Sequence, residues 1–112
     1  MKLTDAQKTD WFIAEAAKHG ITVRYKTEAP NGGEVIYFNI PSNIEEGKKR
    51  PYFMIWTGNG DDYKWHPEFG HWYMPKNDKE RRACPTTEYY KEEQLAEAIA
   101  KYAEEIKKEA AE

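Results

Sequence analysis

A chain of 112 residues has the size of one domain, and we take 1–112 as a single domain. Its formal net charge of −3 provides no field that would attract nucleic acid or an anionic membrane, and no apolar run is long enough for a membrane-spanning helix. Hydrophobic residues make up 39% of the chain, so four Trp, eight Tyr and four Phe must supply much of a lean core. A lone Cys84 and a polar N-terminus predict a cytoplasmic protein.

The N-terminal residues carry the signals of a helix. Thr4 and Gln7 match a capping box, and an apolar stripe at helical spacing follows. Gly20 is a natural stop for a helix. We therefore expect a helix over about residues 4–19.

Three strands are expected next. Residues 21–27 alternate between apolar and polar side chains, which is typical of a half-buried strand, whereas 35–40 and 52–56 are apolar on both faces. Turn-forming residues lie between them at 30–33 and after them at 58–62. This order predicts an antiparallel sheet.

From residue 63 to 85 no periodicity persists, so we expect a long aromatic loop in which 72–74 is compatible with a short fourth strand. Thr86 or Thr87 is expected to cap a last helix that runs to about Lys108. Its apolar residues step by four, three and four, and so commit one face to the core: Leu95, Ile99, Tyr102 and Ile106.

The predicted fold is therefore α+β, in the order α-β-β-β-aromatic loop-α, with the N- and C-terminal helices packed on an antiparallel sheet. Strands that are apolar on both sides need cover on the face that the helices leave open. The aromatic segment 63–73 is the first candidate for that cover, and a homodimer or another partner is the next.

Two arrangements would make this chain a metalloprotein or a metal-dependent enzyme, and neither has a strong signature. His66 and His71 with the distant Cys84 offer three zinc ligands, but lack the tight spacing of structural zinc sites. Asp62 and Lys64 match the Asp-x-Lys element of metal-dependent nucleases, but follow the predicted third strand and lie beside turn glycines. We therefore predict no enzyme, no metal and no cofactor.

The order helix, three strands, helix is similar to that of double-stranded-RNA-binding domains. That family grips phosphates with a basic pair of lysines at the start of its second helix. Residues 87–93 read Thr-Glu-Tyr-Tyr-Lys-Glu-Glu instead, so the resemblance fails at the residues that bind. A single-stranded nucleic-acid binder remains an alternative, because aromatic residues are interleaved with lysines and arginines.

We predict that the chain recognises another protein, because Trp and Tyr are enriched among residues that dominate binding. The candidate residues lie in the aromatic segment and on the acidic last helix: Trp56, Tyr63, Trp65, His66, Phe69, His71, Trp72, Tyr73, Glu92, Glu93 and Glu97. A pocket for a planar or nucleotide-like small molecule in the same loop is the main alternative.

The small size, lean core and acidic helix resemble the small inhibitors of phages and mobile elements, including anti-CRISPR proteins, by type alone. From residue 88 onward there are eight acidic and four basic residues, a net charge of −4. Under this analogy the acidic residues would imitate phosphates toward a basic nucleic-acid-binding protein.

Overall fold

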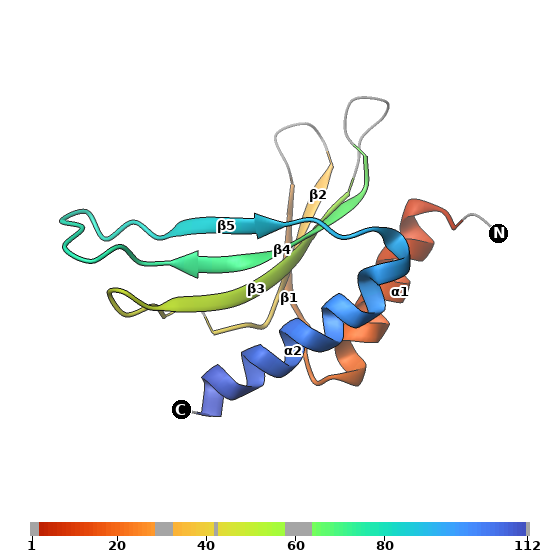
Figure 1. The fold of residues 1–112 in the computed structure, drawn as a ribbon. Coiled ribbons are helices and arrows are strands. Elements are labelled where there is room, and N and C mark those ends of the chain that lie inside the picture. The colour runs from red at the N-terminus through yellow and green to blue at the C-terminus, as the bar shows by residue number, and fades with distance from the viewer. Residues whose placement is uncertain (1–2, 29–32, 42, 58–63, 112) are drawn as a thin grey trace.

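The computed structural model describes residues 3–28, 33–41, 43–57 and 64–111. They form an α+β fold in which five antiparallel strands lie in the order β1-β2-β3-β4-β5 (Figure 1). The elements, in chain order, are α1 (Asp5–Lys18), β1 (Val23–Glu28), β2 (Glu34–Phe38), β3 (Lys49–Trp56), β4 (His66–Tyr73), β5 (Cys84–Glu88), the 3₁₀ turn η1 (Glu92–Gln94) and α2 (Leu95–Ala111).

Helix α1 confirms the helix that the capping box and Gly20 predicted over about residues 4–19. The Thr4 hydroxyl accepts a hydrogen bond from the Gln7 amide at 3.1 Å, and the Gln7 side chain accepts one from the Thr4 amide at 2.9 Å. Gly20 follows the helix with φ of +83°, a conformation that costs glycine little. The first three strands are confirmed with shifted ends: 23–28 where 21–27 was predicted, 34–38 where 35–40 was predicted, and 49–56 where 52–56 was predicted.

The expected aromatic loop is wrong, because residues 66–73 form a full strand. All eight residues of β4 pair with β3, from His66 opposite Trp56 to Tyr73 opposite Lys49. Proline, glycine and two histidines hide the alternation of this strand in the sequence. Gly70 is required there, because a Cβ would lie 2.2 Å from the Thr86 carbonyl oxygen on β5.

The predicted cap of the last helix is also wrong. Thr86 and Thr87 lie in β5, paired with His71 and Gly70, and the chain turns into η1 and α2 only afterwards. The start of η1 is held by the Gln94 side chain, which accepts a hydrogen bond from the Lys91 amide at 3.1 Å. Threonine suits an exposed edge strand as well as a cap, so its presence alone did not distinguish the two.

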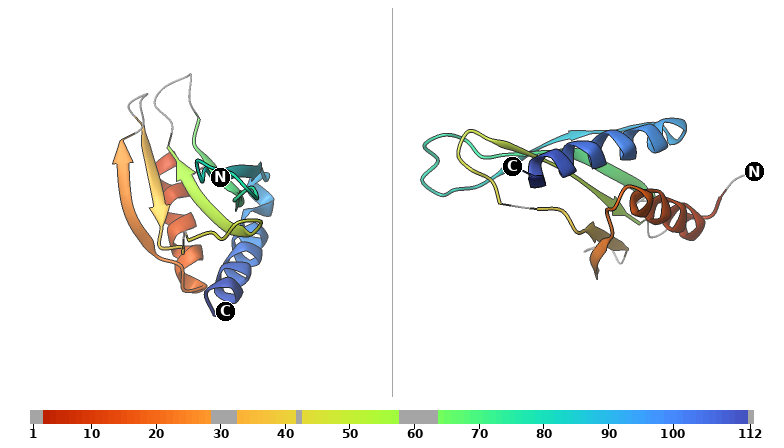
Figure 2. Two further views of the ribbon diagram at one scale, coloured as in Figure 1. Left: turned by 90° about the vertical axis from the view of Figure 1, so that its left-hand side faces the viewer. Right: turned by 90° about the horizontal axis from the view of Figure 1, so that it is seen from below.

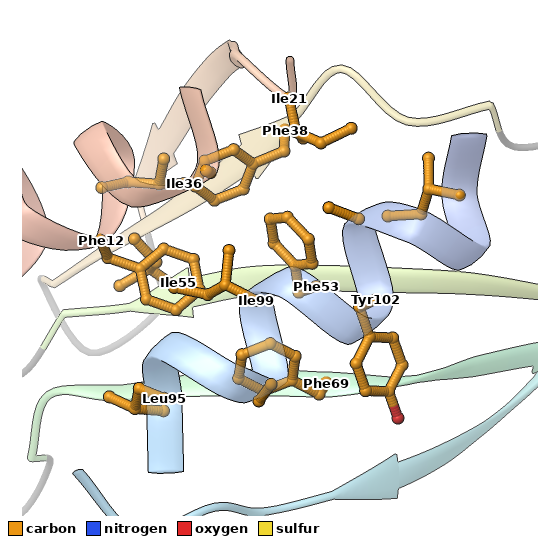
Figure 3. Packing of buried hydrophobic residues seen from close by; sticks show 14 of the residues in the cluster. Phe12, Ile21, Ile36, Phe38, Phe53, Ile55, Phe69, Leu95, Ile99 and Tyr102 are labelled. Atoms are coloured by element: carbon orange, nitrogen blue, oxygen red, sulfur yellow. The ribbon is translucent and has the colours of Figure 1, made fainter. Parts of the chain in front are cut away.

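The core lies between one face of the sheet and both helices, and Figure 3 shows its packing. Phe12 of α1 contacts the rings of Phe38, Phe53 and Phe69, which come from three different strands. Tyr102 of α2 also packs against Phe69, and its hydroxyl is directed toward β5. These fully buried rings hold both helices on the same face.

The sheet is strongly twisted, so that β1 and β2 run in a clearly different direction from β4 and β5 (Figures 1 and 2). No helix of the described residues covers the second face, yet Val35, Tyr52 and Met54 on it are at most 8% exposed. The larger side chains around them, including Trp56 and Trp72, supply their cover.

Candidate functional site

The second face of the sheet is the candidate site, and we call it the open face. It consists of the side chains of β2, β3 and β4 that point away from the helices, together with one tyrosine at each flank that contacts them. These residues are Tyr25, Val35, Tyr37, Tyr52, Met54, Trp56, His66, Glu68, Trp72 and Tyr89. Residues two apart in a strand share a face, and the register brings these rows together.

Aromatic rings pair across neighbouring strands of the open face. Tyr25 stacks on Tyr37 with ring centroids 4.9 Å apart, and Tyr52 lies 5.1 Å from Trp72. Such pairs contribute about 0.5–1.5 kcal/mol beyond the area they bury. They also cover the sheet, which accounts for the low exposure of Val35, Tyr52 and Met54 although no helix of the described residues lies over this face.

At its flanks the open face presents large rings to solvent. Tyr25 is 50% exposed on the edge strand β1, and Tyr89, which follows β5, is 69% exposed. Between Tyr89 and Trp56 stands His66, whose ring is parallel to that of Trp56 within 8° at 6.2 Å. Aromatic side chains are therefore found on the open face from the edge strand β1 to the segment that follows β5.

A single carboxylate lies within this aromatic surface. The Tyr52 hydroxyl donates to Glu68 Oε2 at 2.8 Å. Burial, helped by the nearby carboxylate, raises the pKa of Tyr52 to about 12. Tyr52 therefore keeps its proton at neutral pH and remains a donor to Glu68.

The indole N–H of Trp56 has no hydrogen-bond partner among the described residues, although it is buried. Buried donors are satisfied in most proteins, so each exception calls for a reason. Here the exception falls on the open face.

Two predicted binding residues are part of the core. Trp65 is 9% exposed and its Nε1 donates to the Thr9 hydroxyl at 2.9 Å, while Phe69 is fully buried between the sheet and α2. Neither ring is presented to a partner in the folded chain. Tyr63 and Asp62 lie outside the described residues.

His71 and Tyr73 are separated from the open face. His71 lies on the helix side, where its Nε2 is 3.1 Å from Glu105 Oε1 of α2. Tyr73 is half-buried at the end of β4, opposite Lys49 and Cys84. His66 and His71 are five residues apart in one strand, so they point to opposite faces and cannot bind one metal ion together. Over the described ranges, no group of three or more metal-binding side chains is found.

A polar groove of about 330 Å³ lies beside His71, between α2 and the last two strands. Glu88 is one of the residues that line it, and Glu88 Oε2 accepts hydrogen bonds from the hydroxyls of Tyr90 at 2.5 Å and Tyr102 at 3.0 Å. These two bonds lower the pKa of Glu88, whereas burial raises the pKa of Tyr102. The network ties β5 to α2 and so has a structural role.

The three predicted acidic residues belong to η1 and α2. Glu92, Glu93 and Glu97 are exposed, and the Glu92 carboxylate lies 2.6 Å from the Lys8 ammonium of α1. Glu97 is on the helix layer, and the sheet separates it from the open face. The aromatic and acidic halves of the predicted site are therefore not one surface.

Sequence reasoning missed several residues of the open face: Tyr25, Val35, Tyr37, Tyr52, Met54, Glu68 and Tyr89. The signal that identifies most of them is alternation by two, as in Tyr52, Met54 and Trp56 of β3. Glu68 lies in β4 and Tyr89 directly follows β5, and neither strand was recognised from the sequence.

No protein-family model matches this chain, and neither the curated proteins nor the solved structures contain a significant match to it. Within the part of the chain that the structure describes, no helix is long and apolar enough to cross a membrane.

Proposed function

We propose that this chain is a small, non-enzymatic protein-binding module and that the open face is its contact surface. The observation that carries the proposal is a sheet face that no described helix covers and that bears three groups of packed rings: Tyr25 with Tyr37, Tyr52 with Trp72, and His66 with Trp56 and Tyr89. Tyr, Trp and Met are the side chains that binding surfaces favour, and exposed aromatic patches of this kind usually mark an interaction site. Tyr25 and Tyr89, at its two flanks, are half or more exposed.

The charges of the open face favour a protein over single-stranded nucleic acid. A nucleic-acid platform combines stacking rings with lysines and arginines that bind phosphates. Glu68 supplies a negative charge on the open face. Arg50 is in the same row as Tyr52 and opposite Trp72, but its side chain is occupied by the Asn43 carbonyl oxygen at 2.7 Å and by Glu109.

The open face also favours a protein over a small molecule. Two hollows of the described surface lie away from the open face, the groove beside His71 and another of about 490 Å³ near Gly20 and Lys107, and both are open and partly polar. A planar ligand favours an enclosed, mainly apolar cavity instead. An extended aromatic surface matches a macromolecular partner better.

A cytoplasmic location is part of this proposal, supported by Cys84, which is free and exposed. A role as an inhibitor of the phage or anti-CRISPR type is supported only by size and by the acidic C-terminal region. Such a role would use Glu93 and Glu97 as a second surface, because they lie on the helix layer.

The proposal is tested by comparing three baits in affinity purification from nuclease-treated lysate of the source cells. The first is the wild type, the second is Tyr25→Ala/Tyr89→Ala on the open face, and the third is Glu93→Gln/Glu97→Gln on the helix layer. All four residues are exposed, so both variants are expected to fold. We expect the wild type and the helix-layer variant to recover the same partner protein, and the open-face variant to fail to recover it.

Binding of that protein is then measured with purified components by calorimetry. A partner that persists with the open-face variant, or that only the helix-layer variant loses, contradicts the proposed surface. Recovery of no partner by any bait speaks against a protein-binding function.

A further inference from the structure

We infer that the partner inserts a cationic side chain, arginine or lysine, against Glu68 at the centre of the open face. This inference rests on the proposed function and identifies the chemistry of its partner. It starts from the environment of the Glu68 carboxylate.

Glu68 has unused hydrogen-bonding capacity. Oε2 accepts from Tyr52, whereas no hydrogen bond to Oε1 is found over the described residues. Among the described ion pairs none involves Glu68, although several other carboxylates lie within 4.0 Å of a Lys or Arg: Glu15, Glu46, Glu80, Glu92 and Glu109. A half-buried carboxylate that lacks a cation gains most when a partner supplies one.

The rings around Glu68 suit the same cation. The Tyr52 hydroxyl contacts the carboxylate, and His66, two residues before Glu68 on the same face of β4, lies 6.2 Å from Tyr89 between ring centroids. Aromatic faces attract ammonium and guanidinium groups, and a guanidinium also stacks on them. A carboxylate among aromatic rings is therefore selective for a cation over a neutral side chain of the same shape.

His66 does not replace that cation. Its Nδ1 lies 3.0 Å from the Lys64 carbonyl oxygen, so this nitrogen is directed to the backbone, and no described ion pair joins His66 to Glu68.

The same carboxylate argues against a second copy of this chain as the occupant. A two-fold dimer buries the same patch of both subunits, so an axis near Glu68 brings two carboxylates together. Like charges at the centre of an interface are unfavourable. A partner of opposite charge at this point avoids that repulsion.

The test is selection of a displayed random-peptide library on the whole protein, in parallel on Glu68→Gln and on Glu93→Gln. The Glu68→Gln side chain keeps an oxygen for Tyr52 and removes only the charge, and Glu93→Gln removes an exposed charge of the helix layer. We expect the wild type and Glu93→Gln to enrich peptides with a shared Arg or Lys position, and Glu68→Gln not to enrich them.

The best peptide is then synthesised with its basic residue and with a neutral isostere, citrulline for arginine or norleucine for lysine. Either change alone, Glu68→Gln in the protein or the neutral isostere in the peptide, is expected to raise the Kd roughly tenfold. The two changes together are expected to raise it no further than either one alone. Equal binding of basic and neutral peptides to the wild type overturns the inference.

The outcomes separate this inference from the proposed function. Peptides that lack a shared basic residue, but are lost in Tyr25→Ala/Tyr89→Ala, overturn the cation and leave the open face as the binding surface. Peptides that bind that double variant as well as the wild type, or no enrichment at all, contradict both. Self-association that strengthens in Glu68→Gln identifies a second copy as the occupant and also overturns the cation.

Discussion

Trp65 and Tyr89 show how residues of similar chemistry differ once their positions are known. Both are large aromatic residues at the end of a strand: Trp65 directly precedes β4, and Tyr89 directly follows β5. Trp65 is 9% exposed and donates to Thr9 of α1, whereas Tyr89 is 69% exposed. At the residue scale, therefore, exposure and the hydrogen-bond partner decide whether a ring supports the fold or is presented to a partner.

The first prediction separates these two roles. We expect Trp65→Ala to lower the free energy of unfolding by about 3–5 kcal/mol, because it leaves a cavity beside α1 and an unpaired Thr9. Tyr89→Ala is expected to change it by less than about 1 kcal/mol. Urea denaturation followed by circular dichroism measures both. Equal losses of stability would mean that Trp65 is not a core residue.

At the scale of elements, the Glu88 network connects the edge strand β5 to α2. The carboxylate accepts from Tyr90 and Tyr102, which come from the connecting segment and from the helix. Because these bonds are made to the ionised form, they lower the pKa of Glu88 in the folded chain. Attachment of β5 is thus linked to pH.

The second prediction follows from the direction of that shift. A carboxyl group with a lowered folded pKa contributes stability that is complete above its ordinary value of 4.5 and is lost as pH falls through the folded value. We expect Glu88→Gln to be less stable than the wild type at neutral pH, and the difference to shrink on acidification below that ordinary value. Urea denaturation at a series of pH values measures the difference.

Tyr90→Phe is the matched variant, because it removes the first of the two donors and keeps the charge of Glu88. Its difference from the wild type is expected to shrink over the same acidic range. A difference between Glu88→Gln and the wild type that is independent of pH would contradict a role for the ionised carboxylate.

At the scale of the whole molecule, the order of the strands determines which strands are hydrogen-bonded to a neighbour on both edges and which on one edge only. β3 pairs along its length with β4 and, near its end, with β2, and Phe53 and Ile55 of β3 are nearly fully buried. β1 and β5 are edge strands, and most of their residues are exposed. Protection from local opening is therefore expected to fall from the centre of the sheet to its edges.

The third prediction tests this gradient by amide hydrogen exchange with mass spectrometry on the whole chain. Peptides from β3, β4 and the middle of α2 are expected to exchange last, and those from β1 and β5 first. Addition of a bound partner peptide is expected to slow exchange in β3 and β4 beyond its effect on α2. Slow exchange at β5 in the free protein would mean that another surface covers this edge.

Much of the fold was predictable because its signals are local. The capping box and Gly20 delimit α1, the apolar stripe identifies α2, alternation identifies the first strand, and runs that are apolar on both faces identify the next two. The candidate site was predictable only in part: Trp56, His66 and Trp72 lie on the open face, while Trp65 and Phe69 are buried and His71 is on the helix side.

Two helices, three strands and the α+β class follow from local signals, since caps, turns and side-chain periodicity act over a few residues. Residues 66–73 and 84–88 become strands through long-range contacts, because their hydrogen-bond partners come from neighbouring strands and Gly70 permits the close approach of β5. The tertiary structure also decided which rings are buried. A strand exposes alternate residues to opposite faces, and only the packing of both helices on one face determines which set becomes core and which remains open.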